Sequence, residues 1–189
     1  MGANFSTAVY QLVCSLLNLY MSAVVLRIIL AWVRADFYNP VSQLVWKITQ
    51  PIVGPMVRVV PRWRRLDTAA FAFLVVLACL FVNLVPWLIS RPVPTFWPIQ
   101  AVLKILVLAG NLYTVSMTFQ AILSWFGPGV NNPASNILWS MNEPILRPIR
   151  RVIPPVAGLD LSPLLAIVLM QFMVMLVRLD IMYRAGILG

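Results

Sequence analysis

The chain has no histidine, five acidic residues and two cysteines among its 189 residues. Without histidine it lacks the commonest general base and the usual axial ligand of haem, although methionine could bind haem in principle. Cys14 and Cys79 each stand alone in an apolar stretch, without CxxC or metal-ligand spacing, so we interpret them as packing thiols. With scattered carboxylates and no base–nucleophile pair, we expect no enzymatic activity, no cofactor and no metal site.

Charge of either sign is also scarce. Charged residues make up 10% of the chain and apolar residues 61%, against about 25% and roughly 45–50% in soluble proteins. A soluble fold cannot hide that much apolar surface, whereas a lipid bilayer can. The composition therefore indicates an integral membrane protein.

Four stretches are long and apolar enough to cross a bilayer, which takes roughly 20 residues. They are residues 5–33, 69–89, 98–125 and 162–177. Arg27, Lys104 and Arg178 lie near the ends of these stretches, so we expect them to extend toward lipid headgroups. The predicted fold class is an all-α integral membrane protein with four transmembrane helices.

The net charge of +9 comes mainly from the two long loops between spans. Their basic residues are Arg34, Lys47, Arg58, Arg62, Arg64 and Arg65 in the first loop and Arg147, Arg150 and Arg151 in the second. The opposite side has Arg91, Arg178 and Arg184. The excess of positive charge predicts that both long loops are cytoplasmic and that both termini lie outside. Anionic lipid headgroups fit loops of this kind better than nucleic acid does, and Arg62, Arg64, Arg65, Arg147, Arg150 and Arg151 are the expected lipid contacts.

The two halves of the chain are similar at a constant shift of 93 residues. Between Asn18 and Asp67, 18 of 50 residues are identical to their partners 93 positions later, including Trp32, Pro40 and Trp46. Matches of tryptophan and proline are rare by chance, so this similarity indicates a duplication. We expect two repeats, residues 1–93 and 94–189, each with two spans, arranged in parallel about a pseudo-twofold axis along the membrane normal.

Each repeated loop begins with Asn-Pro, at Asn39 and Asn132. Asparagine suits a helix N-cap and proline the first helical position. Apolar residues follow at helical spacing and predict a short amphipathic helix that ends before Pro51 or Pro144. Such a helix could lie in the cytoplasmic headgroup layer or pack against the neighbouring spans, and both interpretations remain open.

The segment after this helix has proline at both ends in each repeat, which predicts an interrupted element. It could be a corner that joins the short helix to the next span, or one of two paired broken elements at a substrate site, as in transporters. Asp67 and Asp160 precede the second and fourth spans. They suit helix caps, with paired cation ligands as the alternative.

The most specific motif is the run EPILRPIRRVIPP followed by GLDLSP, at residues 143–155 and 158–163, which resembles the YggT family. The first copy keeps Pro51, Pro55, Arg58 and Pro61 but departs elsewhere, with Gln50 in place of the glutamate. The resemblance covers nearly the whole chain. It implies the two-repeat form of the inner membrane of Gram-negative bacteria, whereas the YlmG relatives have one repeat. The candidate residues that the two repeats share are Asn39 and Asn132, Pro51 and Pro144, Arg58 and Arg151, and Asp67 and Asp160.

For function, the resemblance implies a connection with osmotic stress, salt and potassium balance. Relatives are linked to division sites, nucleoid organisation and the maturation of a plastid cytochrome complex. Together with the residues, this favours a non-catalytic protein of the inner membrane that organises membrane or assembles other proteins, with other membrane proteins as partners and self-association left open. The alternative is an ion channel or transporter component.

Overall fold

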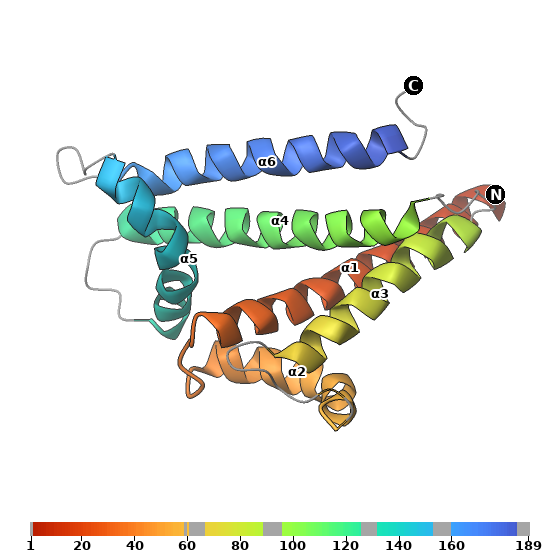
Figure 1. The fold of residues 1–189 in the computed structure, drawn as a ribbon, viewed down its shortest axis with the longest axis horizontal. Helices are drawn as coiled ribbons and strands as arrows, with labels where there is room; N and C mark the ends of the chain where they lie inside the picture. The colour runs from red at the N-terminus through yellow and green to blue at the C-terminus, as the bar shows by residue number, and fades with distance from the viewer. Residues whose placement is uncertain are drawn as a thin grey trace.

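The computed structural model describes residues 2–58, 60, 67–88, 96–125, 132–152 and 160–184. Nearly all of these residues lie in helices. The helices are α1 (Gly2–Trp32), α2 (Pro40–Met56), α3 (Thr68–Leu88), α4 (Trp97–Trp125), α5 (Pro133–Val152) and α6 (Ser162–Arg184) (Figure 1). The expected all-α class is confirmed for the described residues, and no strand occurs among them.

Each half of the chain has the same order of long, short and long helix. All four predicted spans lie in long helices, and the fourth continues past residue 177 to Arg184. Within the described residues, three stretches are long and apolar enough to cross a membrane, namely Thr7–Trp32, Trp97–Leu123 and Ser162–Leu179. The described part of α3 from Thr68 to Asn83 is apolar but shorter.

The helices of the two halves run in matching directions. In Figure 1, α1 and α4 both start at the end of the molecule where α3 and α6 finish, and the short helices α2 and α5 lie toward the opposite end. This arrangement agrees with parallel repeats. It follows from the even number of long helices in each half, since the chain returns to its starting side before the second copy begins.

The start of each short helix was predicted correctly, but its end was not. The side-chain oxygens of Asn39 and Asn132 accept hydrogen bonds from the backbone N–H groups of Val41 and Ala134, at 3.0 and 3.2 Å. Contrary to prediction, both helices then continue through their prolines, to Met56 and Val152.

Four-residue spacing of the prolines is compatible with a bent but continuous helix. An internal proline removes one hydrogen bond to the carbonyl four residues earlier and crowds that carbonyl. Pro51 and Pro55 in α2, like Pro144 and Pro148 in α5, put both losses on one side of the helix. The helix can therefore bend instead of ending. The ribbons of α2 and α5 change direction along their length, so the expected corner is a bent helix (Figure 1).

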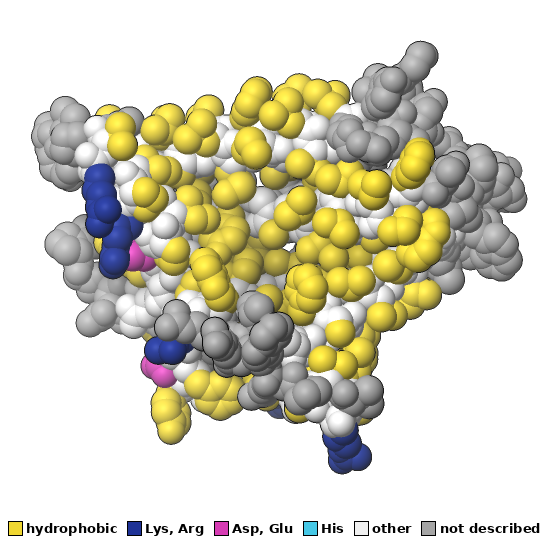
Figure 2. Space-filling model, in the orientation of Figure 1, with side chains coloured by type: hydrophobic (Ala, Val, Ile, Leu, Met, Phe, Trp, Pro, Cys, Tyr) yellow, Lys and Arg dark blue, Asp and Glu magenta, His cyan; other side chains and the backbone are white. Residues whose placement is uncertain are grey.

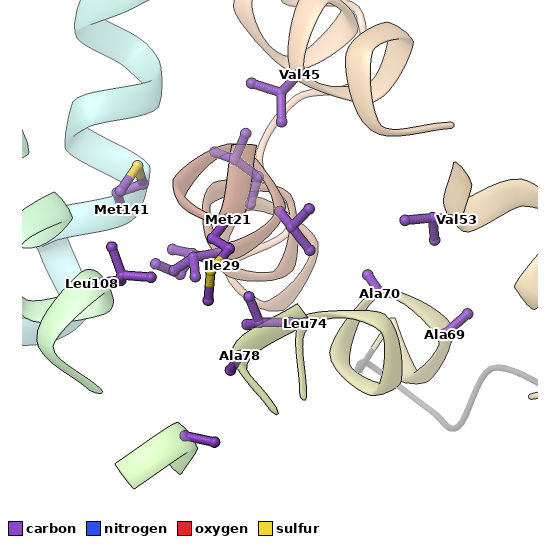
Figure 3. Close-up of a cluster of buried hydrophobic side chains, with 14 of the residues drawn as sticks. Met21, Ile29, Val45, Val53, Ala69, Ala70, Leu74, Ala78, Leu108 and Met141 are labelled. Carbon is purple, nitrogen blue, oxygen red and sulfur yellow. The ribbon is translucent and has the colours of Figure 1, made fainter. Parts of the chain in front are cut away.

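The larger apolar core lies where the first three helices meet α4 and α5. Met21 and Ile29 of α1, Leu74 of α3, Leu108 of α4 and Met141 of α5 are all buried in it (Figure 3). A second, smaller cluster consists of Met117, Leu146 and Ala166. The core therefore extends across both repeats instead of closing within each one.

Helix α4 lies between α6 and the α1–α3 pair (Figure 1). Helix α3 packs on α4, but within the described residues its mirror contact, between α1 and α6, is missing. A twofold axis requires every contact between unlike elements to occur twice. The predicted pseudo-twofold axis is therefore not what the helix packing shows, and the repeats meet through different surfaces.

Much of the outer surface is apolar. Figure 2 shows hydrophobic side chains spread over the long helices, with lysine and arginine at the end that carries α2 and α5. Large side chains such as Leu19, Leu164 and Met175 are more than half exposed. A water-soluble monomer rarely leaves so much apolar surface uncovered, so these helix faces suit a bilayer.

Candidate functional site

Arg27 is the centre of a buried polar cluster in the first repeat. Its Nε lies 2.9 Å from Oδ2 of Asp67, and its Nη1 donates to Thr49 at 3.0 Å and to Gln50 at 3.1 Å. The guanidinium carbon also lies 3.8 Å from the centre of the Trp46 ring. Arg27 is 2% exposed and Asp67 4% exposed. A buried charge needs this density of partners, since each ion loses its hydration.

Three helices supply the cluster. Arg27 comes from α1, while Trp46, Thr49 and Gln50 come from α2 at helical spacing. Asp67 precedes α3, where its Oδ1 also accepts a hydrogen bond from the N–H of Ala70 at 3.2 Å. One carboxylate oxygen therefore caps α3 while the other binds Arg27. The cluster holds the short helix against both long helices of the repeat.

At the matching positions the second repeat has a neutral cluster. Gln120 stands where the first repeat has Arg27, and Asn142 where it has Thr49. Asn142 donates to Gln120 at 2.7 Å and accepts from Ser116 at 3.0 Å, and all three side chains are buried. These bonds join α5 to α4, as those of Arg27 join α2 to α1.

The second repeat takes its cation from the short helix. Nε of Arg150 lies 2.8 Å from Oδ2 of Asp160, and its Nη1 lies 2.8 Å from Glu143. The guanidinium carbon lies 5.0 Å from the centre of the Trp139 ring. Each repeat thus joins an arginine, the tryptophan of its short helix and the aspartate before its second long helix. The first repeat has Val57 at the position of Arg150.

The second ion pair is more open to solvent. The side chains of Arg150 and Asp160 are 23% and 29% exposed. Burial by itself raises the pKa of Asp160, but hydrogen bonds from Ser162 and the neighbouring Arg150 outweigh it and keep the pKa below its ordinary value. Asp160 therefore stays ionised in neutral solution and keeps its hold on Arg150.

Several expected site residues have a defined place in the structure. Asn39 is buried and bonds to the backbone carbonyl of Pro133, which ties the first short helix to the second, whereas Asn132 is exposed. Arg58 and Arg151 are exposed. Arg147 is exposed and pairs with Glu143 at 3.3 Å. Arg62, Arg64 and Arg65 lie outside the described residues.

Arg27 is the main correction among the charged residues. We expected its side chain to extend to headgroups, but it is buried and paired with Asp67. The same expectation for Lys104 also needs revision, because its Nζ lies 4.4 Å from the centre of the Phe81 ring on α3. One sequence signal could have identified Arg27. The equivalent position of the second repeat is Gln120, so both repeats have a polar residue inside an apolar stretch.

No group of three histidine, cysteine or acidic side chains comes together within the residues the structure describes. Cys14 and Cys79 are free thiols, each partly buried. An open groove of about 590 Å³ lies along α2, lined by Phe37, Gln43, Trp46, Lys47, Gln50 and Pro51. The described geometry therefore provides ion pairs that hold helices together and an open, partly aromatic surface next to them.

A sequence model of the CCB3/YggT family matches residues 6–88 and again residues 99–181. The chain belongs to this family. The double match confirms the two repeats and the resemblance drawn from the EPILRPIRRVIPP run. No solved structure matches the chain.

Individual YggT relatives cover most of the chain. The chain is 37% identical over 164 residues to an uncharacterized protein of Vibrio alginolyticus from the proC 3' region. The aligned residues cover 85% of this chain and 88% of that protein. It is 35% identical over 162 residues to the uncharacterized protein YggT of Escherichia coli K12, and these residues cover 84% of this chain and 83% of that protein. A shorter match is to the chloroplastic YlmG homolog protein 2 of Arabidopsis thaliana, which is 36% identical over 64 residues. These residues cover 32% of this chain and 24% of that protein.

Proposed function

We propose that this YggT protein is a non-catalytic scaffold or assembly factor of a bacterial inner membrane, which binds anionic lipid headgroups and other membrane proteins. One observation carries the proposal. The charged and amide groups around Arg27 and Arg150 are used to fix the short helices in place, while the outward sides of those helices present apolar and basic residues.

Helix α2 shows this division most clearly. Its buried side consists of Ser42, Val45, Thr49 and Val53. Its outward apolar residues are Leu44, Ile48 and Ile52, spaced four residues apart. On α5, Trp139 is about half exposed and Arg147 and Arg151 are exposed. An apolar strip beside basic and aromatic residues suits the headgroup layer of a membrane.

The same proposal gives the molecule an orientation. All four long helices span the membrane, and the ends with α2 and α5 face the cytoplasm. The excess of lysine and arginine in the long loops supports this orientation. The basic residues then face the more anionic leaflet, where each contributes about 1 kcal/mol to attraction.

An ion channel or transporter component is the second candidate. The observation in its favour is the buried charge of Arg27, because ionisable residues among apolar spans often lie on ion pathways. Against it, Asp67 and Asp160 are each bound to an arginine. A cation would have to displace a guanidinium to reach either carboxylate.

Photo-crosslinking in native membranes tests the scaffold. A photoreactive residue at Ile48 or Trp139 is expected to give discrete adducts with other membrane proteins, and one at the exposed Leu169 of α6 is expected to give far fewer. Adducts only with lipid or with other copies of the chain would overturn the proposal.

For the second candidate, potassium flux into liposomes is measured for the wild type and for Asp67→Asn/Asp160→Asn. No flux, or flux unchanged by the substitutions, would remove that candidate's aspartate site.

A further inference from the structure

The contact between the two repeats provides a template for a contact between two chains. On the α4 side, Ala101 and Leu108 are buried, and Lys104 lies over the Phe81 ring of α3. On the α3 side, Ala78 and Val82 are buried. Helices α3 and α4 pack against each other and run in opposite directions (Figure 1), so we take these residues as the contact strip on each helix.

This contact joins unlike surfaces of two homologous units. When such units meet head to tail, each carries both surfaces, and the terminal units keep one of them uncovered. Helix α1 corresponds to α4, and α6 corresponds to α3. Because α1 and α6 do not touch within the described part of the chain, the α4-like surface of α1 and the α3-like surface of α6 both remain open.

Both matching strips are uncovered except at Val174, the equivalent of Phe81, which is buried against α4. The α4 strip of buried or half-buried residues is Ala101, Lys104, Ile105, Leu108 and Leu112. Its partners 93 positions earlier, all exposed, are Ala8, Gln11, Leu12, Ser15 and Leu19. Likewise the partners of Ala78 and Val82 are Gln171 and Met175 on α6, and both are exposed.

The polar residues in these strips argue against lipid as their only cover. Gln11 and Ser15 lie inside the apolar stretch Thr7–Trp32, and Gln171 lies inside Ser162–Leu179. An amide or hydroxyl facing hydrocarbon forgoes hydrogen bonds that a neighbouring helix could supply. Bonds of this kind between membrane helices contribute about 0.6 kcal/mol each and set the register of association.

We propose that α1 of one copy docks against α6 of a second copy, in the way that α4 docks against α3 within the chain. The register follows from the template. Because α3 and α4 run antiparallel, counting one turn along each helix from the Lys104–Phe81 contact pairs Leu108 with Ala78, whose equivalents 93 positions away are Ser15 and Gln171. Ser15 of one copy therefore hydrogen-bonds to Gln171 of the next. Association is head to tail and leaves a free α1 and a free α6 at the ends of an open assembly.

Disulfide crosslinking in native membranes tests this geometry. Cys14 and Cys79 are first replaced by alanine, and then Ser15→Cys and Gln171→Cys are introduced together. Mild oxidation is expected to give dimers and a ladder of longer species on non-reducing gels. Either cysteine alone is expected to give monomer, and co-expression of the two single variants is expected to stop at dimer, because each copy then has one reactive surface.

The matched control is Leu16→Cys/Leu169→Cys. Both residues are exposed and lie within two positions of the tested pair, but they sit on other sides of their helices, so at least a tenfold weaker crosslink is expected. Crosslinking of Gln171→Cys with itself as strongly as with Ser15→Cys would overturn the head-to-tail arrangement in favour of a twofold one.

A second measurement uses no cysteine. The mass distribution of the protein in native-lipid nanodiscs is expected to include dimers for the wild type, and the dimer fraction is expected to fall severalfold in Ser15→Leu/Gln171→Leu. Only monomeric wild type together with no adduct from the tested pair would overturn the proposal. Adducts with foreign proteins at Ile48 are a separate result, so this inference and the scaffold function can fail independently.

Discussion

At the scale of single residues, Arg27 shows how one side chain can position a helix. A buried ion pair contributes little net stability compared with apolar residues of the same volume, but removing one partner leaves an uncompensated charge. The unpaired partner here would be Asp67, with Thr49 and Gln50 losing their bonds as well. The arginine is therefore needed because the groups around it are polar.

Replacing Arg27 tests this dependence. We expect Arg27→Met to lower the stability of the protein in detergent by about 3–5 kcal/mol, because Asp67 stays buried without its cation. Arg27→Met/Asp67→Asn is expected to be less destabilised than the single variant, since asparagine can still cap α3. Thermal unfolding followed by tryptophan fluorescence gives the comparison. Arg58→Gln, at an exposed residue, serves as the control, with a change within about 0.5 kcal/mol. A double variant less stable than Arg27→Met would contradict the explanation.

Asp160 makes the second repeat sensitive to acid. Because its pKa in the folded protein is depressed, its contribution is fully present above its ordinary pKa of about 3.9 and is lost as the pH falls through the folded value. We expect Asp160→Asn to cost about 1 kcal/mol at pH 7, a modest value because the pair with Arg150 and Glu143 is partly exposed. Unfolding measured from pH 7 to pH 3 should show the difference from wild type shrinking toward zero, and a constant difference would exclude this linkage.

Sequence alone predicted Asp67 as a helix cap, since an aspartate directly before an apolar run indicates the start of a helix. Its ion pair with Arg27 depends on two residues 40 positions apart, which no local pattern brings together. Arg150 was predicted to contact lipid headgroups because it belongs to a run of basic residues, which usually lies on the surface. Glu143 and Asp160, seven positions before it and ten after it, take that charge instead.

At the scale of helices, helix starts were predictable and the course through the prolines was not. Asn39 and Asn132 determine their caps through the next two residues alone. Whether Pro51 ends a helix depends instead on packing further along, where Val53 is fully buried and keeps the next turn in place. The energy of that burial competes with a local proline penalty of about 3 kcal/mol, and a single sequence shows only the penalty.

The close approach of α4 and α6 depends on Gly110. A Cβ at this position would lie 2.4 Å from Cγ2 of Val174, which is buried on α6. We expect Gly110→Ala to destabilise the protein by about 1–3 kcal/mol, because the two helices must move apart. Gly110→Ala/Val174→Ala should recover part of the loss in the same thermal assay. The control is Gly54→Ala, where the nearest atom is the end of the flexible Gln50 side chain. Equal effects of both glycine substitutions would contradict the packing argument.

At the scale of the whole molecule, the duplication was visible in the sequence but the way the repeats join was not. Identities such as Trp32 with Trp125 indicate that the repeats share an ancestor. They do not determine how the two repeats pack against each other. The packing depends on residues where the copies differ. Lys104 contacts Phe81 of the first repeat and Leu108 is buried, whereas Gln11 and Ser15 at the same positions of the first copy are exposed. Divergence at these positions lets the repeats meet through unlike surfaces.

The direction of the helices makes one prediction about the molecule in its membrane. With all four long helices crossing the membrane as proposed, the shared direction of α1 and α4 puts both short helices in one compartment and the start of α1 and the end of α6 in the other (Figure 1). The excess of positive charge in the long loops predicts that the short helices face the cytoplasm. Phosphatase and fluorescent-protein fusions at Gly2, Arg65, Arg91, Arg151 and Gly189 are expected to report periplasm, cytoplasm, periplasm, cytoplasm and periplasm in turn. If α3 failed to cross, the fusions at Arg65 and Arg91 would report the same side, and α1 and α4 would then have to run in opposite directions through the bilayer. That result would contradict their shared direction in the structure.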